Sequence, residues 1–210
     1  MDVAGGGGDG LGVAFELEFR RGLQAVIVDP RPISQRGRSR QLSKLHFRKR
    51  CLAALAPGIG FSPTARRLSE NIGRTGEDFE LQQVCDAFGH DFAASAEGRA
   101  LLGACSVVVG MHPDQATHPI VEIATQLGKP WAVVPCCVFP KMNPNKCLAD
   151  GRLVRSYDEL CEFLAGACGG VREVSLPFEG RNRAFFWRPG GDCQVPQVPS
   201  DQAIGGGNPI

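Results

Sequence analysis

The chain has 210 residues, 43% of them hydrophobic, which suits one domain with a sizeable core, and its net charge of +1 says little about partners. Nine cysteines, without a leader of basic, apolar and small-residue regions, argue against a disulfide framework and predict an intracellular protein, cytoplasmic or nuclear. No apolar run reaches the length of a membrane span, so we expect a soluble protein without a membrane partner.

Near the start of the chain, the glycine cluster at residues 5–8 suits a tight turn beneath a ligand, because glycine weakens helices and strands alike. A helix is expected next, with its positive dipole end toward that turn. Residues 25–28 then form a compact apolar strand, and Asp29 lies at its carboxyl end. A glycine turn followed by such an acid is typical of nucleotide sites, where the acid accepts hydrogen bonds from ribose hydroxyls. A low-complexity N-terminus is the alternative.

Positive charge is concentrated in one stretch, since residues 30–69 contain ten Lys and Arg and no Asp or Glu. Such a stretch can contact a phosphate backbone, although charge runs are usually solvated faces, and both alternatives stay open. We interpret residues 36–75 as an irregular basic insertion. The cations expected to contact RNA or another polyanion are Arg36, Arg38, Arg40, Lys44, Arg48, Lys49 and Arg50.

The next stretch carries weaker signals. Apolar residues at helical spacing predict a helix over residues 80–88. A third strand is expected over residues 88–92, and a short helix over residues 97–104.

The clearest pattern is a strand, a helix and a strand between residues 105 and 140. Short β-branched runs predict buried parallel strands over residues 106–109 and 131–134. The helix between them is expected to begin with Thr117 as its cap and to stop at Gly128. Because loops beyond the carboxyl ends of such strands carry the chemistry, residues 111–114 and 135–137 are expected to line the functional edge.

The reactive residues of these two loops allow more than one role. His112 suits a general base or a substrate clamp, but also a structural histidine. Asp114 can be catalytic or can cap the following helix. Cys136 and Cys137 can be nucleophiles, zinc ligands or packing residues. Without a C-x-x-C or a paired-histidine spacing, no metal site is expected.

The last part of the domain has clear start and stop signals. Ser156 and Glu159 form a capping box for a helix expected to end at residues 169–170. Residues 171–178 and 184–187 are expected to form an antiparallel hairpin. Beyond the domain, residues 189–210 are rich in Gly, Pro, Gln and Ser and are expected to be disordered.

Taken together, these residues resemble the Rossmann-fold S-adenosylmethionine-dependent methyltransferases. The first motif of that family, an acid followed by a G-x-G turn, is matched by Asp2, Gly6 and Gly8, and its ribose-binding acid by Asp29. The resemblance implies that these four residues bind S-adenosyl-L-methionine.

More specifically, the chain is similar to a methyltransferase branch with a histidine motif after strand four and a PCC motif after strand five, distantly like transfer RNA ribose methylases. His112 matches the first motif and Pro135, Cys136 and Cys137 match the second. The resemblance implies that His112 and Asp114 are catalytic and that residues 135–137 line the substrate pocket, with the acceptor unknown and RNA as a candidate.

The fold implied for residues 1–188 is α/β, a doubly wound, mostly parallel Rossmann-like sheet with a C-terminal antiparallel hairpin. Only Met1 precedes Asp2, so strand one is expected to be truncated. A catalytically degenerate, methyltransferase-like binding module is therefore the alternative function. A nicotinamide dehydrogenase would share the glycine turn and the acid after strand two.

Overall fold

The structure is a computed structural model that describes residues 13–14, 16–17, 23–32, 82–141 and 145–190. Its strands are β1 (Val26–Val28), β2 (Gln82–Val84), β3 (Val108–Met111), β4 (Trp131–Val134), β5 (Arg172–Ser175) and β6 (Arg183–Trp187). Its helices are α4 (His90–Ala94), α5 (Ala96–Ala104), the 3₁₀ turn η1 (Asp114–Ala116), α6 (Thr117–Gln126) and α7 (Tyr157–Ala165). The chain is thus a mixed α/β protein.

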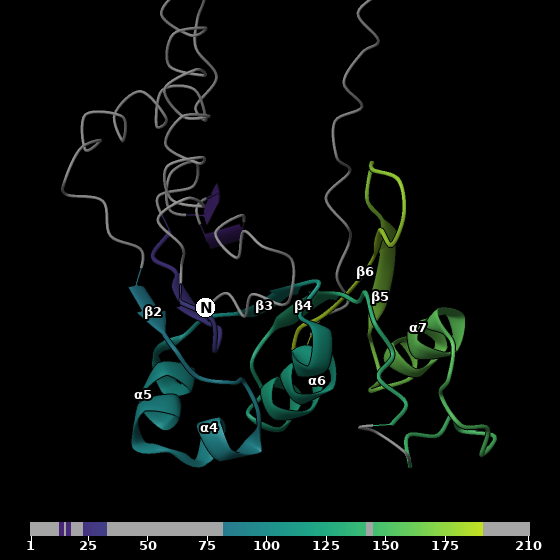
Figure 1. The fold of residues 1–210 in the computed structure, drawn as a ribbon, viewed down its shortest axis with the longest axis horizontal. Coiled ribbons are helices and arrows are strands. Elements are labelled where there is room, and N and C mark those ends of the chain that lie inside the picture. Colours follow the sequence, from purple (N-terminus) through teal and green to yellow (C-terminus); the bar gives the residue numbers. More distant parts are fainter. Residues whose placement is uncertain (1–12, 15, 18–22, 33–81, 142–144, 191–210) are drawn as a thin grey trace, which may run out of the picture.

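The strands pair in both directions. β1 pairs with β2 in parallel, and β3 pairs with β4 in parallel. Among the described residues, β1 and β2 form a two-stranded sheet, and a four-stranded sheet has the order β3-β4-β6-β5, in which β6 runs antiparallel to both of its neighbours. Figure 1 shows β1 and β2 on one side of β3 and β4 and the hairpin β5–β6 on the other, with α4, α5 and α6 below the strands. The predicted C-terminal hairpin is therefore confirmed.

The predicted strand, helix and strand at the centre of the chain are confirmed with shifted bounds. β4 spans the predicted residues, whereas β3 begins two residues later than expected, because its register pairs Val108 with Trp131. The role of Thr117 is different: it is the first residue of α6, which has no side-chain cap. Gly128, at φ +61°, follows the end of the helix as predicted.

The prediction for residues 80–92 was wrong. Gln82–Val84 is a strand where a helix was expected, and the expected third strand at residues 88–92 is mostly α4. β2 forms because it pairs with β1 and because Gln83 Nε2 donates to the carbonyls of Asp29 and Arg31 at 3.1 and 2.8 Å. Contacts with residues this distant in sequence stabilise the strand, although the local apolar residues are spaced as in a helix.

The predicted helix at residues 97–104 is confirmed as α5, which packs closely on α4. Ser95 caps α5, its Oγ accepting from the Gly98 nitrogen at 2.9 Å. A Cβ atom on Gly98 would lie 1.8 Å from the Phe92 carbonyl oxygen. Glycine is therefore required at this position for the two helices to meet as they do.

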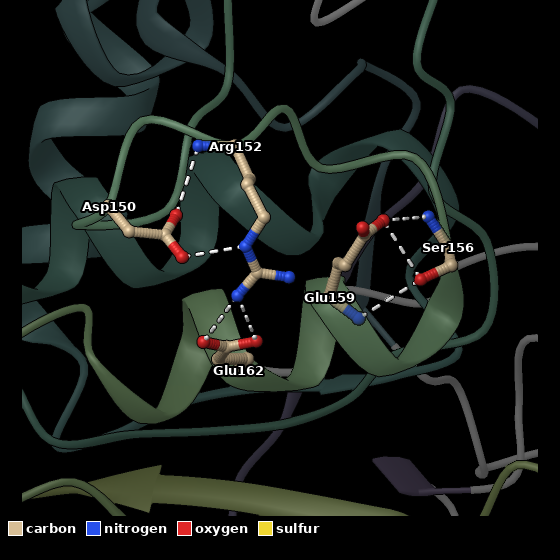
Figure 2. A network of polar contacts seen from close by, with 5 residues as sticks. All are labelled: Asp150, Arg152, Ser156, Glu159 and Glu162. Carbon is tan, nitrogen blue, oxygen red and sulfur yellow. Dashed lines mark hydrogen bonds and ion pairs between the residues drawn. The ribbon is translucent and has the colours of Figure 1, made fainter.

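The capping box at the start of α7 is confirmed, as Figure 2 shows. The Glu159 carboxylate accepts from the Ser156 nitrogen at 2.8 Å, and the Ser156 hydroxyl accepts from the Glu159 nitrogen at 3.2 Å. Arg152 joins Asp150 in the preceding loop to Glu162 on the helix (Figure 2). The helix ends at Ala165, with Gly166 as its C-cap, earlier than the predicted glycine pair.

The core lies between the central strands and the helices α6 and α7. Its largest fully buried side chains include Trp131, Phe185, Ile120, Leu160 and Leu164. The helices of the described segments lack the length and apolar character needed to cross a bilayer. The predicted glycine turn, most of the basic insertion and nearly all of the predicted C-terminal tail fall outside the described residues.

Candidate functional site

Two parallel strands bring the predicted loops to one edge. The register pairs Met111 with Val134, the last residues of β3 and β4, and the His112 nitrogen donates to the Val134 carbonyl at 2.9 Å. Both loops therefore begin side by side. Beyond the strands, the Cys136 thiol donates to the Asp114 carboxylate at 3.2 Å. The structure thus brings together the histidine turn and the cysteine pair, as the parallel arrangement predicted.

The histidine turn is held in an unusual backbone conformation. His112 and Asp114 have φ values of +50° and +48°, a region that costs energy for residues other than glycine. Pro113 between them is buried, and a Cβ on Gly110 would meet its ring at 2.8 Å. Tight packing of the turn on β3 therefore maintains the strained conformation of both residues.

The His112 ring is oriented by the hairpin. Its Nε2 atom lies 3.1 Å from the Arg181 carbonyl oxygen, and its ring meets the edge of Phe178 at a centroid distance of 6.5 Å. A carbonyl can only accept, so Nε2 must carry the proton in this contact. In the neutral ring Nδ1 is then the unprotonated nitrogen. His112 is thus arranged so that Nδ1 can accept a proton.

Arg181 is a site residue that sequence reasoning missed. Its guanidinium donates to the Cys136 carbonyl and stacks over the Tyr157 ring, 4.6 Å from the centroid. It lies in the hairpin loop before β6, which runs antiparallel to β4 and so begins where β4 ends. The sequence placed Arg181 in the predicted hairpin loop, but only the pairing of β6 with β4 shows that this loop lies beside the end of β4. We call His112, Asp114, Cys136, Cys137 and Arg181 the strand-end site.

Asp29 lies at the carboxyl end of β1, as predicted, and is buried. Its Oδ1 accepts from the Arg31 backbone nitrogen at 2.8 Å and from Nε at 3.0 Å, while Oδ2 accepts from Nη2 at 3.0 Å. The hydrogen bond with Asp29 raises the pKa of Arg31, and the charge of Asp114 acts in the same direction. Arg31 is therefore bound firmly to Asp29, the residue that is expected to contact the cofactor. Oδ2 keeps capacity to accept a ligand hydroxyl.

Cys136, the first residue of the cysteine pair, carries a protonated thiol. Burial, together with hydrogen bonds to Asp114 and Cys137, raises the pKa of Cys136 to about 12. Since the thiolate is the nucleophile, Cys136 in this state is a hydrogen-bond donor and not a nucleophile. The Asp114 carboxylate accepts that bond, and neither η1 nor α6 has a side-chain cap, so the capping role considered for Asp114 was wrong. Pro135 before the pair is buried.

The remaining predicted residues cannot be placed, because Asp2, Gly6 and Gly8 lie outside the described residues. The same holds for the seven cations expected to contact a polyanion, all between residues 36 and 50. Their roles stay predictions.

No protein-family model, no curated protein and no solved structure matches the chain. Its likeness to methyltransferases therefore rests on the motifs of the sequence. The chemistry of the strand-end site has to be inferred from its own residues.

A separate cavity of about 680 Å³ lies between α6, α7 and residues 147–149. Its walls include Phe163 and the acid Glu122, whose Oε2 lies 3.2 Å from His90 and 3.5 Å from His118. Burial lowers the pKa of His118. Of the predicted site residues that the structure describes, none lines this cavity, so we do not assign it to the strand-end site.

The strand-end site offers one candidate base, two thiols, one carboxylate and one guanidinium at one edge of the sheet. The positions of His112 and Arg181 are coupled through two contacts. His112 Nε2 contacts the Arg181 carbonyl, and the Arg181 guanidinium donates to the carbonyl of Cys136 in the neighbouring loop. Such an arrangement can orient a polar acceptor and remove its proton. It is suited to a reaction in which placement of the reactants does most of the work.

Proposed function

We propose that the chain is an S-adenosyl-L-methionine-dependent methyltransferase, with the cofactor beside Asp29 and the acceptor at the strand-end site. One observation carries the proposal: the ends of β3, β4 and the β5–β6 hairpin bring His112, Cys136 and Arg181 to one edge. In open α/β sheets, ligands bind outside the carboxyl ends of the strands.

The proposed fold is a doubly wound, Rossmann-like sheet. The parallel pairs β1–β2 and β3–β4 support it, and α6 forms the connection from β3 to β4. The antiparallel strand β6 beside β4 and the edge strand β5 agree with the place that the methyltransferase family gives to its last two strands. The truncated strand one of this proposal falls outside the described residues.

Methyl transfer requires little from the protein beyond correct placement of the cofactor and the acceptor. When bound, the cofactor supplies an activated methyl group on a sulfonium, and holding the acceptor in line with it is worth several kcal/mol, as a rough order of magnitude. For a hydroxyl or amide acceptor, Nδ1 of His112 takes the proton. Arg181 holds the His112 ring in place through its carbonyl.

The second candidate is a methyltransferase-like binding module without activity. One observation favours it: Arg31 makes three hydrogen bonds to the Asp29 carboxylate. These bonds leave fewer acceptor positions on the carboxylate for ribose hydroxyls. We also propose an intracellular location, cytoplasmic or nuclear. The seven cysteines in the described segments are all free thiols, which suits a reducing compartment.

Calorimetric titration of the purified chain with S-adenosylhomocysteine tests the proposal. We expect heat of binding and a thermal shift. No heat and no shift at millimolar ligand would favour a module that does not use this cofactor. Enhanced NADH fluorescence on mixing, without a response to S-adenosylhomocysteine, would instead favour a dehydrogenase.

Asp29→Ala is expected to weaken S-adenosylhomocysteine binding by about 1.5–3 kcal/mol, because ribose hydroxyls lose a charged acceptor. Calorimetry measures the loss. Arg31→Ala is the matched control, since its side chain is 60% exposed and its removal leaves the carboxylate free. Affinity in that variant should stay or increase. An equal loss in both variants would mean that Asp29 acts only as the partner of Arg31.

As acceptor we propose RNA, bound through the seven cations between residues 36 and 50. If each contacts a phosphate, binding should weaken with salt at a slope of about −5 in log K against log salt, from roughly 0.7 per phosphate on single strands. Filter binding over a range of salt concentrations measures the slope. Replacing Arg48, Lys49 and Arg50 with Ala should make the slope shallower by about 2, because three phosphate contacts are lost.

Replacing Arg66 and Arg67 with Ala is the control for this prediction, since both belong to the basic stretch but not to the proposed contact. The slope should stay unchanged in that variant. Affinity that does not depend on salt, or no affinity for transfer RNA and structured RNA pools, would contradict an RNA acceptor.

A further inference from the structure

Three side chains of ligand type converge at the end of β4. One ligand atom each from Asp114, Cys136 and Cys137 lies within 4.8 Å of the other two. Neighbouring residues in a strand face opposite sides, so two adjacent cysteines seldom share one metal. Here both follow the end of β4 at Val134, where that alternation no longer applies, and both sulfur atoms lie near the Asp114 carboxylate.

We propose that Asp114, Cys136 and Cys137 bind one Zn²⁺ ion through two thiolates and one carboxylate, with a fourth position open. This site goes beyond methyl transfer and does not depend on it. Spacing between the cysteines did not predict a metal, since the carboxylate joins them only in the fold. Two thiolates favour zinc over magnesium or calcium, which prefer oxygen ligands.

The geometry requires little adjustment. Tetrahedral zinc with normal bond lengths sets its sulfur and oxygen ligands roughly 3.6–3.8 Å apart. The Cys136 sulfur is already 3.2 Å from Asp114 Oδ1, and the third ligand atom lies within 4.8 Å of both. Shifts of about an ångström in these loop side chains, of which Cys137 is exposed, would complete the site.

Charge and access also fit a divalent cation. Two thiolates and a carboxylate carry −3, so a bound Zn²⁺ leaves −1, and the two thiol protons pass to solvent. Arg31, which feels the charge of Asp114, and Arg181, bound to the Cys136 carbonyl, balance that remainder. Cys137 is exposed, so the ion can enter from solvent, and the open position can hold water or an acceptor atom.

Zinc titration of the metal-free full chain, in competition with a chromophoric chelator, tests the site. We expect one Zn²⁺ per chain and, with Co²⁺ in its place, a thiolate-to-cobalt charge-transfer band. Cys137→Ser and Cys136→Ser should each lower affinity by more than the 10–100-fold that loss of an outer partner costs. Circular dichroism checks folding, and the exposed Cys137 is the safer substitution.

Cys147→Ser is the matched control, because that cysteine is also exposed but lies outside the cluster. Its affinity for zinc should be unchanged. No stoichiometric binding by the wild type, or binding that survives both Cys136→Ser and Cys137→Ser, would overturn the site. Because the measurement is metal binding, its failure would leave the S-adenosylhomocysteine titration, and thus the proposed function, unaffected.

Discussion

His112→Ala is expected to lower methyl transfer about a hundredfold, or about 2.7 kcal/mol in activation free energy, while cofactor affinity stays nearly unchanged. The reason is the orientation of the ring: Nε2 is held by the Arg181 carbonyl at 3.1 Å, so that Nδ1 is the nitrogen that can take the proton of the acceptor. Transfer of a labelled methyl group to RNA measures turnover, and calorimetry with S-adenosylhomocysteine measures affinity.

His118→Ala is the control for this prediction, since His118 lies on α6 beside Glu122 and outside the strand-end site. Turnover should stay close to that of the wild type. If His112→Ala instead loses cofactor affinity as much as Asp29→Ala does, with both variants folded by circular dichroism, then the histidine turn belongs to the cofactor half of the crevice.

Local signals predicted the elements that local interactions define. The capping box of Ser156 and Glu159 and the β-branched run of β4 need no distant partner to be recognised. The prediction for residues 80–92 was wrong because the structure of this segment depends on a distant partner strand. β2 is a strand because it pairs with β1, more than fifty residues earlier, although the apolar residues Leu81, Val84, Cys85 and Phe88 fit helical spacing. Pairing between distant segments decided that element.

The site was predicted in part for the same reason. Parallel strands end at one edge, so the meeting of His112 and Cys136 could be expected from β3 and β4 alone. Arg181 could not be found without knowing that β6 returns beside β4. The bonds from Arg31 to Asp29 and from Cys136 to Asp114 depend on side-chain placement, which no sequence spacing specifies.

Phe185→Ala is expected to reduce the free energy of unfolding by about 3–5 kcal/mol, the usual cost of removing a buried aromatic side chain. Phe185 is fully buried and pairs with Val133 of β4 and Glu173 of β5, at the centre of the antiparallel part of the sheet. Urea unfolding followed by circular dichroism measures the loss. Loss of this magnitude would be a large part of the stability of a single domain.

The next residue provides the control, because Phe186 points to the opposite face of the same strand and is only half-buried. Phe186→Ala should therefore cost clearly less. Loosening β6 at Phe185 should also displace Arg181 and with it the His112 ring, so turnover should fall further than the unfolded fraction explains. Equal losses of stability in the two variants would mean that both faces of β6 are buried to the same extent in the whole chain.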